Sequence, residues 1–543
     1  MKTASYAITA GDYEHAGSAS SGLKELLKKV GVEPETLRRA MIAAYEAEMN
    51  VVIHSVGGQM QIALDDRQID VVVLDDGPGI PDVDLAMKEG YSTAPPKARQ
   101  LGFGAGLGLP NIRKNSDRLE IQSAAGQGTR VHFAIHLRPQ EAADLRRSSH
   151  SIRVVADRCR GDMDCVRACP TRALRIRRGQ PAILDHLCID CGACVAACGG
   201  EALAVDCATA GLPSRVPSST VGQADRGTAG EETVLVVPTA FLAQFGQGAT
   251  PRQVAAALGE LGFGMVVAMA AWEEALRGAV LRYAIEEARK TPVLAPVCTA
   301  VLNLIEVRFP SLIDQVAPFL TPPEAARKEL GGRPAAFVAC CPAQYTALRA
   351  GGRGDLVVPT GLLGAIASRL EGRGGMPNAE CRMPNEMPNA ECRIPSRPFE
   401  VSGIRHVVRV LEMIENGLLE EARVIELYAC DEGCFGSSLW VEDPFVARRR
   451  WEDARGRPEA AAPRSRAEVL ARAIRREQRL AARPGLRLDP DMAKAIAKLA
   501  EIDRLARSLP GKNCSRCGAP TCVALAEDIV LGRTQASCAW EEE

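Results

Sequence analysis

The stretch Glu426-Leu-Tyr-Ala-Cys-Asp-Glu-Gly-Cys-Phe-Gly-Ser-Ser-Leu-Trp-Val-Glu-Asp-Pro-Phe445 sets Cys430 and Cys434 one helical turn apart, beside Gly433 and Gly436. Two thiolates at this spacing can hold one iron–sulfur cluster from the same side, while the glycines let backbone N–H groups approach its sulfides. The pair needs two more thiolates to complete such a site. The stretch therefore predicts a cluster whose remaining ligands come from elsewhere in the chain.

Two upstream cysteines are candidates for these ligands, Cys298 and Cys341. Each follows a short apolar run that predicts a buried strand, so each is expected at a strand end, where α/β folds place their sites. The three motifs, in this order, resemble the C-terminal domain of the large subunit of iron-only (FeFe) hydrogenases, over residues 231–450. The resemblance implies a cubane held by four cysteines, the last of which bridges to a two-iron subsite: Cys298, Cys341, Cys430 and Cys434. The alternative is four buried free cysteines in an ordinary α/β domain.

Three departures from the hydrogenase pattern point away from fast hydrogen turnover. Val297 stands where the family usually has a proton-relaying cysteine, and an aliphatic side chain carries no proton. Gln344 stands where the family has a lysine, so the hydrogen-bond donor there brings no charge. The glycine-rich sequence after the third motif is thinned to Phe435-Gly436-Ser437-Ser438. The domain therefore resembles the divergent, sensory branch of the family, and the presence of the two-iron subsite stays open.

Composition limits the class of protein. At 543 residues the chain is too long for one core, and several domains are expected. A net charge of −1 and 4% aromatic residues argue against direct nucleic-acid binding. We expect no membrane span and no signal peptide, and the 19 cysteines then favour metal sites in a reducing cytoplasm over disulfides. Four of the cysteines fall in no cluster motif: Cys207, Cys340, Cys381 and Cys392.

The N-terminal region, residues 1–140, carries four local signals in order. Apolar positions in 37–54 recur at helical spacing and set Glu46 and Asn50 on one face. Residues 69–75 predict a strand that runs into an Asp-Asp-Gly-Pro-Gly turn. A glycine-rich loop then precedes a helix that begins near Pro110, an arrangement that offers bare N–H groups to phosphate oxygens, and a last strand follows at Thr129.

These signals together resemble the α/β-sandwich ATPase fold shared by histidine kinases, gyrase and anti-sigma-factor serine kinases (the GHKL type), and they favour the last group. The resemblance implies that Glu46 is the general base, Asn50 the Mg²⁺ ligand and Asp75 the adenine reader. The residues that would shape the pocket and lid, or approach adenine, are Gly77, Gly79, Gly104, Gly106, Gly108 and Thr129. The alternative is a degenerate copy of the fold with a purely structural role. His54 is expected to be a packed core histidine.

Residues 150–207 contain two ferredoxin cluster motifs, one complete and one with Asp162 in place of a cysteine. Because the fourth cysteine of each run serves the other cluster, one intact 4Fe–4S site is expected from Cys188, Cys191, Cys194 and Cys169. The other site is expected from Cys159, Cys165 and Cys198, with Asp162 as an oxygen ligand or no ligand. Carboxylate is the harder donor, so this iron should be more labile and the site could cycle between 3Fe–4S and 4Fe–4S forms. The alternative is a tolerated substitution without a role.

The remaining segments are a linker, an insertion, a connector and a last cluster motif. We expect a linker at 208–230, a low-complexity insertion at about 372–396 and a helical connector at 455–508. Residues 509–543 carry a tight motif with a distal fourth thiolate: Cys514, Cys517, Cys522 and Cys538. The motif resembles the small 4Fe–4S domain of corrinoid iron–sulfur proteins and membrane electron-transfer complexes, with zinc as the competing metal.

The sequence thus predicts a multidomain α/β protein: a GHKL-type ATPase, a two-cluster ferredoxin-like module, a hydrogenase-like α/β domain and a small C-terminal cluster domain. It would bind up to four iron–sulfur clusters, ATP and Mg²⁺. We expect a cytoplasmic redox or hydrogen sensor whose output is serine phosphorylation of an anti-anti-sigma-like protein or sequestration of a sigma factor, together with a redox partner protein. The alternative functions are an oxidoreductase that makes or consumes hydrogen under control by ATP, and an electron carrier whose ATPase domain drives conformational change.

Overall fold

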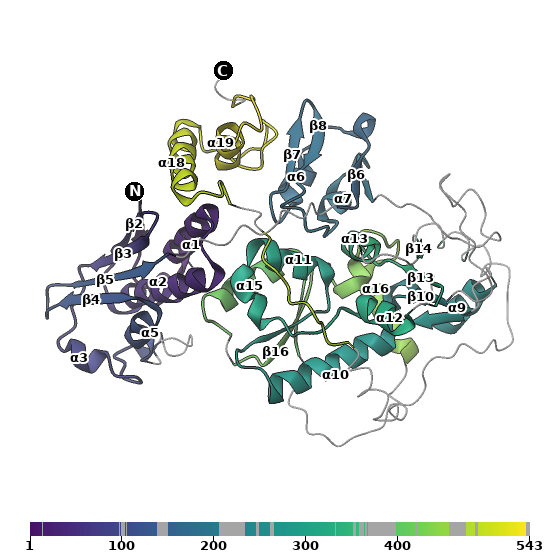
Figure 1. Cartoon of the computed structure of the whole chain (residues 1–543), viewed down its shortest axis with the longest axis horizontal. Helices are drawn as coiled ribbons and strands as arrows, with labels where there is room; N and C mark the ends of the chain where they lie inside the picture. Colours follow the sequence, from purple (N-terminus) through teal and green to yellow (C-terminus); the bar gives the residue numbers. More distant parts are fainter. Residues whose placement is uncertain are drawn as a thin grey trace.

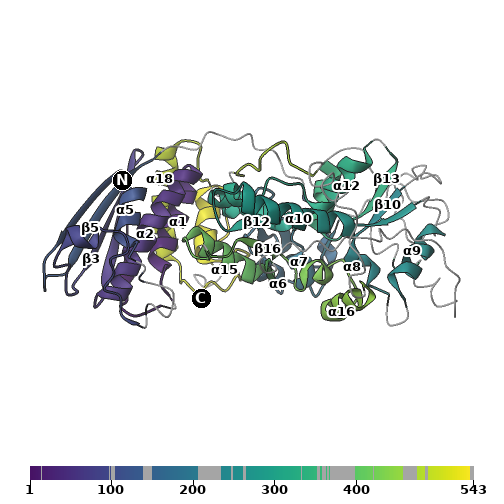
Figure 2. The same cartoon turned by 90° about the horizontal axis from the view of Figure 1, so that it is seen from below.

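The computed structural model of the chain describes residues 1–13, 15–96, 98, 104, 106–137, 150–205, 234–245, 249–260, 265–331, 333–350, 355–357, 363, 366, 398–419, 421–455, 474–483 and 487–538. The N-terminal domain lies at one end of an elongated body and the large central domain occupies the rest of its length, with two small domains against them (Figures 1 and 2). Within the described residues, no helix is both long and apolar enough to cross a membrane. The predicted linker, the insertion at 372–396, and Cys207, Cys381 and Cys392 lie outside the described residues.

The N-terminal domain is a two-layer α/β sandwich. Its elements are β1 (Lys2–Ile8), α1 (Ser18–Val30), α2 (Pro34–His54), β2 (Gly58–Leu64), β3 (Gln68–Asp75), α3 (Val83–Ala86), α5 (Gly108–Asn115), β4 (Arg118–Ser123) and β5 (Thr129–His136). The five strands pair antiparallel in the order β1-β2-β3-β5-β4, with α1, α2 and α5 on one face of the sheet (Figure 2). Burial alternates along β2, as expected when only one face is covered. The predicted helix at 37–54 and strand at 69–75 are confirmed.

The second domain repeats one small pattern. Its elements are β6 (Ile152–Val154), η1 (Ala156–Arg158), α6 (Asp164–Ala168), β7 (Leu174–Arg177), β8 (Gln180–Ile183), α7 (Ala193–Ala197) and β9 (Leu203–Val205). Strand β6 pairs with β9 and β7 pairs with β8, both antiparallel. Cys165 and Cys194 are the second residues of the two short helices and are buried. The repeat thus brings the cysteines of both runs into one small core.

The central domain contains two parallel sheets, β11-β10-β13-β14 and β12-β16-β15. Its elements are β10 (Val234–Val237), α8 (Thr239–Leu242), α9 (Pro251–Gly259), β11 (Met265–Ala268), α10 (Ala270–Glu286), β12 (Val293–Ala295), α11 (Thr299–Arg308), η3 (Pro310–Gln315), α12 (Pro322–Leu330), β13 (Ala335–Val338), α13 (Pro342–Ala350), β14 (Asp355–Val357), β15 (Phe399–Ser402), α15 (Ile404–Glu415), β16 (Val424–Tyr428), η4 (Gly433–Gly436) and α16 (Pro444–Arg455). Cys298 and Cys341 follow β12 and β13, which confirms that each lies at a strand end, and Cys430 follows β16. Strand β13 belongs to the first sheet and β12 and β16 to the second, so both sheets contribute predicted ligands.

The C-terminal region differs from the predicted helical connector. Residues 474–483 and 487–491 contain no helix, and helix α18 (Met492–Ser508) begins only after Asp491 caps it. The non-helical segment lies on the central domain, where the Leu320 N–H donates to the Ile474 carbonyl at 2.7 Å and Arg483 pairs with Glu306 at 2.9 Å. The hydrogen bond and the ion pair give this segment partners on the central domain in place of the hydrogen bonds that a helix would form within the segment. Helix α18 and the last helix, α19 (Cys522–Val530), then lie beside α1 and share its hydrophobic core (Figure 1).

Candidate functional site

The nucleotide pocket predicted in the N-terminal domain is built on α2. Glu46 and Asn50 stand one turn apart on that helix, and both face the first turn of α5. A Cβ at Gly108 would lie 3.1 Å from Asn50 Oδ1 and 3.3 Å from Glu46 Oε2, so a larger residue would press on both side chains. Asn111, which the sequence analysis missed, donates its amide to Glu46 Oε1 at 2.7 Å.

The Asn50 amide fits a pocket that awaits a ligand. Its Nδ2 is buried and, among the described residues, has no hydrogen-bond partner. Leaving a buried polar atom unpaired is unfavourable, and such atoms in native structures commonly mark a site for a ligand, ion or water. Oxygen donors of an amide and a carboxylate are the ligands that Mg²⁺ prefers. The unpaired Nδ2 is a hydrogen-bond donor and cannot bind a cation, so it suits an acceptor such as a phosphate oxygen, whereas Asn50 Oδ1 is the atom that would hold Mg²⁺.

The floor of the pocket is formed where β3 ends. Asp75 Oδ1 accepts hydrogen bonds from the Ser55 hydroxyl and from the Gly77 N–H, both at 2.8 Å, which fixes the carboxylate. Gly79 has φ +71°, and a Cβ there would lie 2.0 Å from the Ala124 carbonyl oxygen. Only glycine tolerates both the backbone angle and this approach. The Thr129 and Ser123 hydroxyls lie 3.0 Å apart beside the same turn.

Part of the glycine-rich loop is described, and it contacts the backbone near Gly90. Gly104 and Gly106 are described, both with positive φ, whereas residues 101–103 and 105 lie outside the described residues. A Cβ at Gly106 would lie 2.5 Å from the Gly90 carbonyl carbon, and the Gly90 N–H donates to the Gly106 carbonyl at 3.0 Å. The structure therefore brings Gly108 to Glu46 and Asn50, and Asp75 and Gly77 to Ser55 at the end of α2, whereas Gly79, Gly104, Gly106 and Thr129 contact other loops and strands or have no printed contact with α2. Their roles stay predictions, as does that of His54, which is half-buried with its pKa lowered by burial.

In the central domain, the four predicted ligands lie near enough to shift one another's pKa, but within the described residues no group of three or more cysteines, histidines or carboxylates lies close enough to hold a metal ion. Cys298 occupies the N-cap position of α11, and Cys434 lies in η4. The pKa of the Cys298 thiol is raised to about 11, mainly by burial and also by neighbouring Cys434, while N–H groups of Ala429, Val301 and Ala300 point to the sulfur and oppose the rise. Burial also raises the pKa of the Cys430 thiol, reinforced by Cys341 and by the other two. Thiols that are costly to ionise alone, but surrounded by N–H donors, suit a cluster that supplies the compensating positive charge.

The departures from the hydrogenase pattern have visible consequences. Gln344 is buried, and its Oε1 accepts the Cys340 N–H at 3.0 Å, so the side chain folds back on its own helix. Val297 is partly buried against the apolar core of the domain. Cys340, for which no role was predicted, is buried beside Cys434, and the Ser437 hydroxyl donates to its carbonyl at 2.6 Å. A fifth thiol thus lies at this site, and only its position next to Cys341 could have pointed to it.

The intact ferredoxin site has the geometry of a cluster cavity. A small pocket is lined by Cys169, Cys188, Cys191 and Cys194. Burial, with a smaller contribution from Cys169, raises the pKa of Cys191 to about 12. Cys191 is also near enough to raise the pKa of Cys430. The two cluster sites are therefore neighbours across the boundary between the second and central domains.

The damaged ferredoxin site gathers the other predicted residues. Burial raises the pKa of the Cys165 thiol to about 11, and Cys198, Asp162 and Cys159 contribute to the rise. Asp162 is exposed, and its Oδ1 accepts the Asp164 N–H at 3.1 Å, at the start of α6. One oxygen of the Asp162 carboxylate thus stabilises the first turn of α6. Whether Asp162 binds iron stays a prediction.

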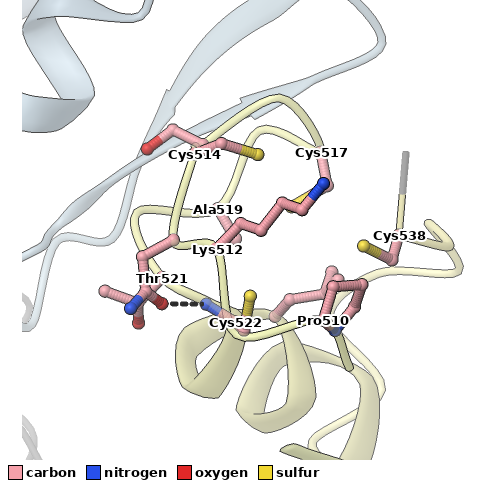
Figure 3. A pocket seen from close by; sticks show the side chains of 11 residues that line it. Pro510, Lys512, Cys514, Cys517, Ala519, Thr521, Cys522 and Cys538 are labelled. Atoms are coloured by element: carbon pink, nitrogen blue, oxygen red, sulfur yellow. Dashed lines mark hydrogen bonds between the residues drawn. The ribbon is translucent and has the colours of Figure 1, made fainter. Parts of the chain in front are cut away.

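The C-terminal motif also surrounds a cavity. Cys514, Cys517, Cys522 and Cys538 line a small pocket, and sulfur atoms turn toward it in Figure 3. The Cys522 N–H donates to Asn513 Oδ1 at 2.9 Å, and Lys512 extends over the opening (Figure 3). Within the loop, the Gly518 carbonyl accepts the Ile176 N–H at 2.7 Å, which attaches the loop to β7.

Family profiles match four parts of the chain. They are described as histidine kinase-, DNA gyrase B-, and HSP90-like ATPase (residues 36–139), 4Fe-4S dicluster domain (151–199), the C-terminal domain of the iron only hydrogenase large subunit (231–330), and "Putative Fe-S cluster" (509–538). The N-terminal domain belongs to this ATPase family, and the chain joins it to three iron–sulfur domains, one of them of the hydrogenase type.

The relatives of the N-terminal domain include a protein kinase and anti-sigma F factors. The serine/threonine-protein kinase RsbT of Bacillus subtilis is 29% identical over 119 residues, which cover 21% of this chain and 84% of RsbT. The anti-sigma F factor of Clostridium novyi is 30% identical, over 18% of this chain and 68% of that protein, and that of Pasteuria penetrans is 35% identical, over 16% and 60%. An FeFe-hydrogenase structure from Chlamydomonas reinhardtii aligns with 44% of this chain and 88% of its own, at 14% identity and a TM-score of 0.35.

Proposed function

We propose that this chain senses the redox state of its clusters, or hydrogen, in the cytoplasm and transmits it to an ATP-dependent output of the anti-sigma-factor kinase type. The observation that carries the proposal is the α2 face: Glu46 and an Asn50 amide with an unpaired buried nitrogen meet at the Gly108 turn. A degenerate copy of the fold with a purely structural role would not need a carboxylate and an amide that both face the Gly108 turn. The three iron–sulfur domains joined to it supply the input.

Each residue of the pocket has a role in this proposal. Glu46 takes the proton of a serine hydroxyl on the substrate protein, while Asn111 orients its carboxylate. Asn50 would hold Mg²⁺, which neutralises charge on the phosphates when bound. Asp75 reads adenine from a carboxylate fixed by Ser55. The partner that fits is an anti-anti-sigma-like protein with a phosphorylatable serine, or a sigma factor held without phosphorylation.

The decisive test is the affinity for ATP of the reconstituted protein with its clusters oxidised and then reduced. Allosteric coupling typically changes affinity by about 5- to 150-fold, and it must be reciprocal. A tenfold change would require ATP to shift a one-electron cluster potential by about 59 mV, which redox titration measures on the same protein. Asn50→Ala should abolish binding in both states, while Gln59→Ala, an amide lost from an exposed strand position, should not. Equal affinity in both states would contradict coupling through ATP binding.

Transfer of phosphate distinguishes the output. We expect Mg·ATP-dependent phosphorylation of a serine in a co-encoded anti-anti-sigma-like protein, at a rate that depends on the redox state and is lost in Glu46→Gln. If neither redox state transfers phosphate but a sigma factor is bound, sequestration is the output. If neither occurs, the kinase-type output is wrong.

A second candidate function is an oxidoreductase that makes or consumes hydrogen. The nearness of Cys191 to Cys430 favours it, because neighbouring clusters can pass electrons. Val297 and Gln344 oppose it, since neither can relay a proton or bring a positive charge. Hydrogen uptake by protein matured with a two-iron subsite would establish this function, and the absence of uptake in matured protein would leave the sensor.

A further inference from the structure

A buried ionic junction joins the ATPase domain to the central domain. Lys24 and Lys28 of α1 both reach Glu415, the last residue of α15: Lys24 forms a close ion pair with it, and Lys28 Nζ lies 3.8 Å from Oε1. The Ser311 hydroxyl in η3 also donates to Glu415, and Lys28 donates to the Arg308 carbonyl. The side chains of Lys24, Lys28 and Glu415 are only 6%, 3% and 1% exposed. Charges buried this deeply persist only when paired, so the junction is specific in its geometry.

Two helices lead from cluster ligands to this junction. Helix α11 begins at its N-cap, Cys298, and ends at Arg308. Helix α15 follows Gly403, whose N–H donates to the Cys430 carbonyl at 3.2 Å, and ends at Glu415. At 1.5 Å per residue these helices are about 15 and 18 Å long. Each therefore connects a predicted cluster ligand to the junction through continuous helical backbone.

On the ATPase side, α1 is attached to the helix that holds the nucleotide pocket. No side chain within the described part of α1 caps its N-terminus; instead Glu48 of α2 accepts the N–H groups of Gly17, Ala19 and Ser20, at 3.0, 3.1 and 2.9 Å. Glu48 is 2% exposed and lies between Glu46 and Asn50 on α2. Helix α2 also packs directly against η3 and α15. A shift of α1 therefore acts on the turn of α2 that carries the candidate base and the candidate Mg²⁺ ligand.

We infer that the Lys24–Lys28–Glu415–Ser311 junction transmits the state of the hydrogenase-like cluster site to the nucleotide pocket, through α1 and its Glu48 cap. The inference rests on the proposed function and names its route. It assigns the regulatory input of the ATPase to the central domain, and it makes Glu415 and Ser311 positioning residues that touch neither nucleotide nor cluster.

The test measures ATP affinity with clusters oxidised and reduced in the full chain and in three variants. Glu415→Gln keeps the volume and removes the charge, and Ser311→Ala removes one hydrogen bond and leaves both lysines paired. The matched control is Glu287→Gln, which breaks an exposed ion pair with Arg475 in the same domain. We expect the redox-dependent change in affinity, about 5- to 150-fold for typical coupling, to persist in the control and to fall several-fold in both junction variants. If Glu415→Gln loses ATP binding in both redox states, its affinities no longer report on coupling. The redox-dependent change in affinity of Ser311→Ala then tests the inference.

Hydrogen exchange gives an independent readout of the route. Reduction should change the protection of the Gly17, Ala19 and Ser20 amides in the unaltered protein and in Glu287→Gln, but not in Glu415→Gln. If the unaltered protein shows redox-dependent affinity and the junction variants show the same change, this route is overturned while the proposed function stands. If the unaltered protein shows no redox dependence, the coupling in the proposed function is wrong and the inference falls with it.

Discussion

The ATPase domain is joined to the central domain through charges and to the C-terminal domain through an apolar core. The first junction consists of Lys24, Lys28 and Glu415, all buried. The second contains Ile502 of α18, fully buried in the same hydrophobic cluster as Leu27 of α1. Apolar contacts are tolerant of direction, whereas buried ion pairs are stable only in one geometry. The comparison indicates that the charged junction fixes the relative position of its two domains more strictly than the apolar one does.

The largest expected effect comes from breaking the charged junction. Glu415→Ala leaves two buried lysines without their partner and should cost about 3–5 kcal/mol of stability. The measurement is denaturant unfolding followed by hydrogen exchange in α1, which reports on this part of the chain. Glu287→Ala, at an exposed pair, should cost no more than about 1 kcal/mol. Similar values for the two would mean that the charged junction does not hold the domains.

Truncation of one side chain in the apolar junction should lower the free energy of unfolding nearly as much. Ile502→Ala removes a side chain of 0% exposure and should cost about 2–5 kcal/mol. Because the core is shared, the ATPase and C-terminal domains should lose protection together, and the loss should not depend on salt. The control is Ile285→Ala, at a residue that is 52% exposed. Loss of protection in α18 alone would contradict a shared core.

The pH dependence should separate the two junctions. Burial lowers the pKa of Lys28 from 10.5 to about 7, while Glu415 opposes this. Between pH 7 and pH 10.5 the unfolded chain binds a proton at Lys28 that the folded chain does not, so the free energy of unfolding should rise with pH in this window. Below pH 7 both states bind this proton, so Lys28 adds no pH dependence there. The slope is at most about 1.4 kcal/mol per pH unit. Unfolding measured across the window should lose this slope in Lys28→Met and keep it in Lys29→Met.

The smallest effect is expected where charge accompanies the apolar junction. Lys29 Nζ lies 3.7 Å from Glu527 Oε2, with side chains 16% and 17% exposed. Lys29→Met should therefore change the free energy of unfolding by no more than about 1 kcal/mol, and less at high salt. A loss comparable to that of Ile502→Ala would show that charge holds this junction too, and the contrast between the two faces would fail.

Much of the fold followed from local pattern. Helical spacing at 37–54 and the strand before Asp75 were predictable because one-sided burial imposes its period on the residues. The connector was not: residues 474–483 have helical composition, but Arg483 and the Ile474 carbonyl find partners on the central domain. Composition reports intrinsic preference, and tertiary bonds override it. Ser55 and Asn111 of the pocket were not predicted, because neither belongs to a sequence motif and only the folded structure brings them to Asp75 and Glu46.

What the sequence by itself determined is the chemistry of each domain. The spacing of cluster-binding cysteines and of phosphate-binding glycines depends on the group that they would bind. Such a pattern can therefore be recognised within a few residues of sequence. What only the tertiary structure decided is how the domains meet. On a helical pattern Lys24 and Lys28 are ordinary charged residues, and nothing in the sequence near Glu415 indicates that it is buried. Burial and pairing depend on which surfaces the folded chain brings together, and that information is spread over residues far apart in the sequence.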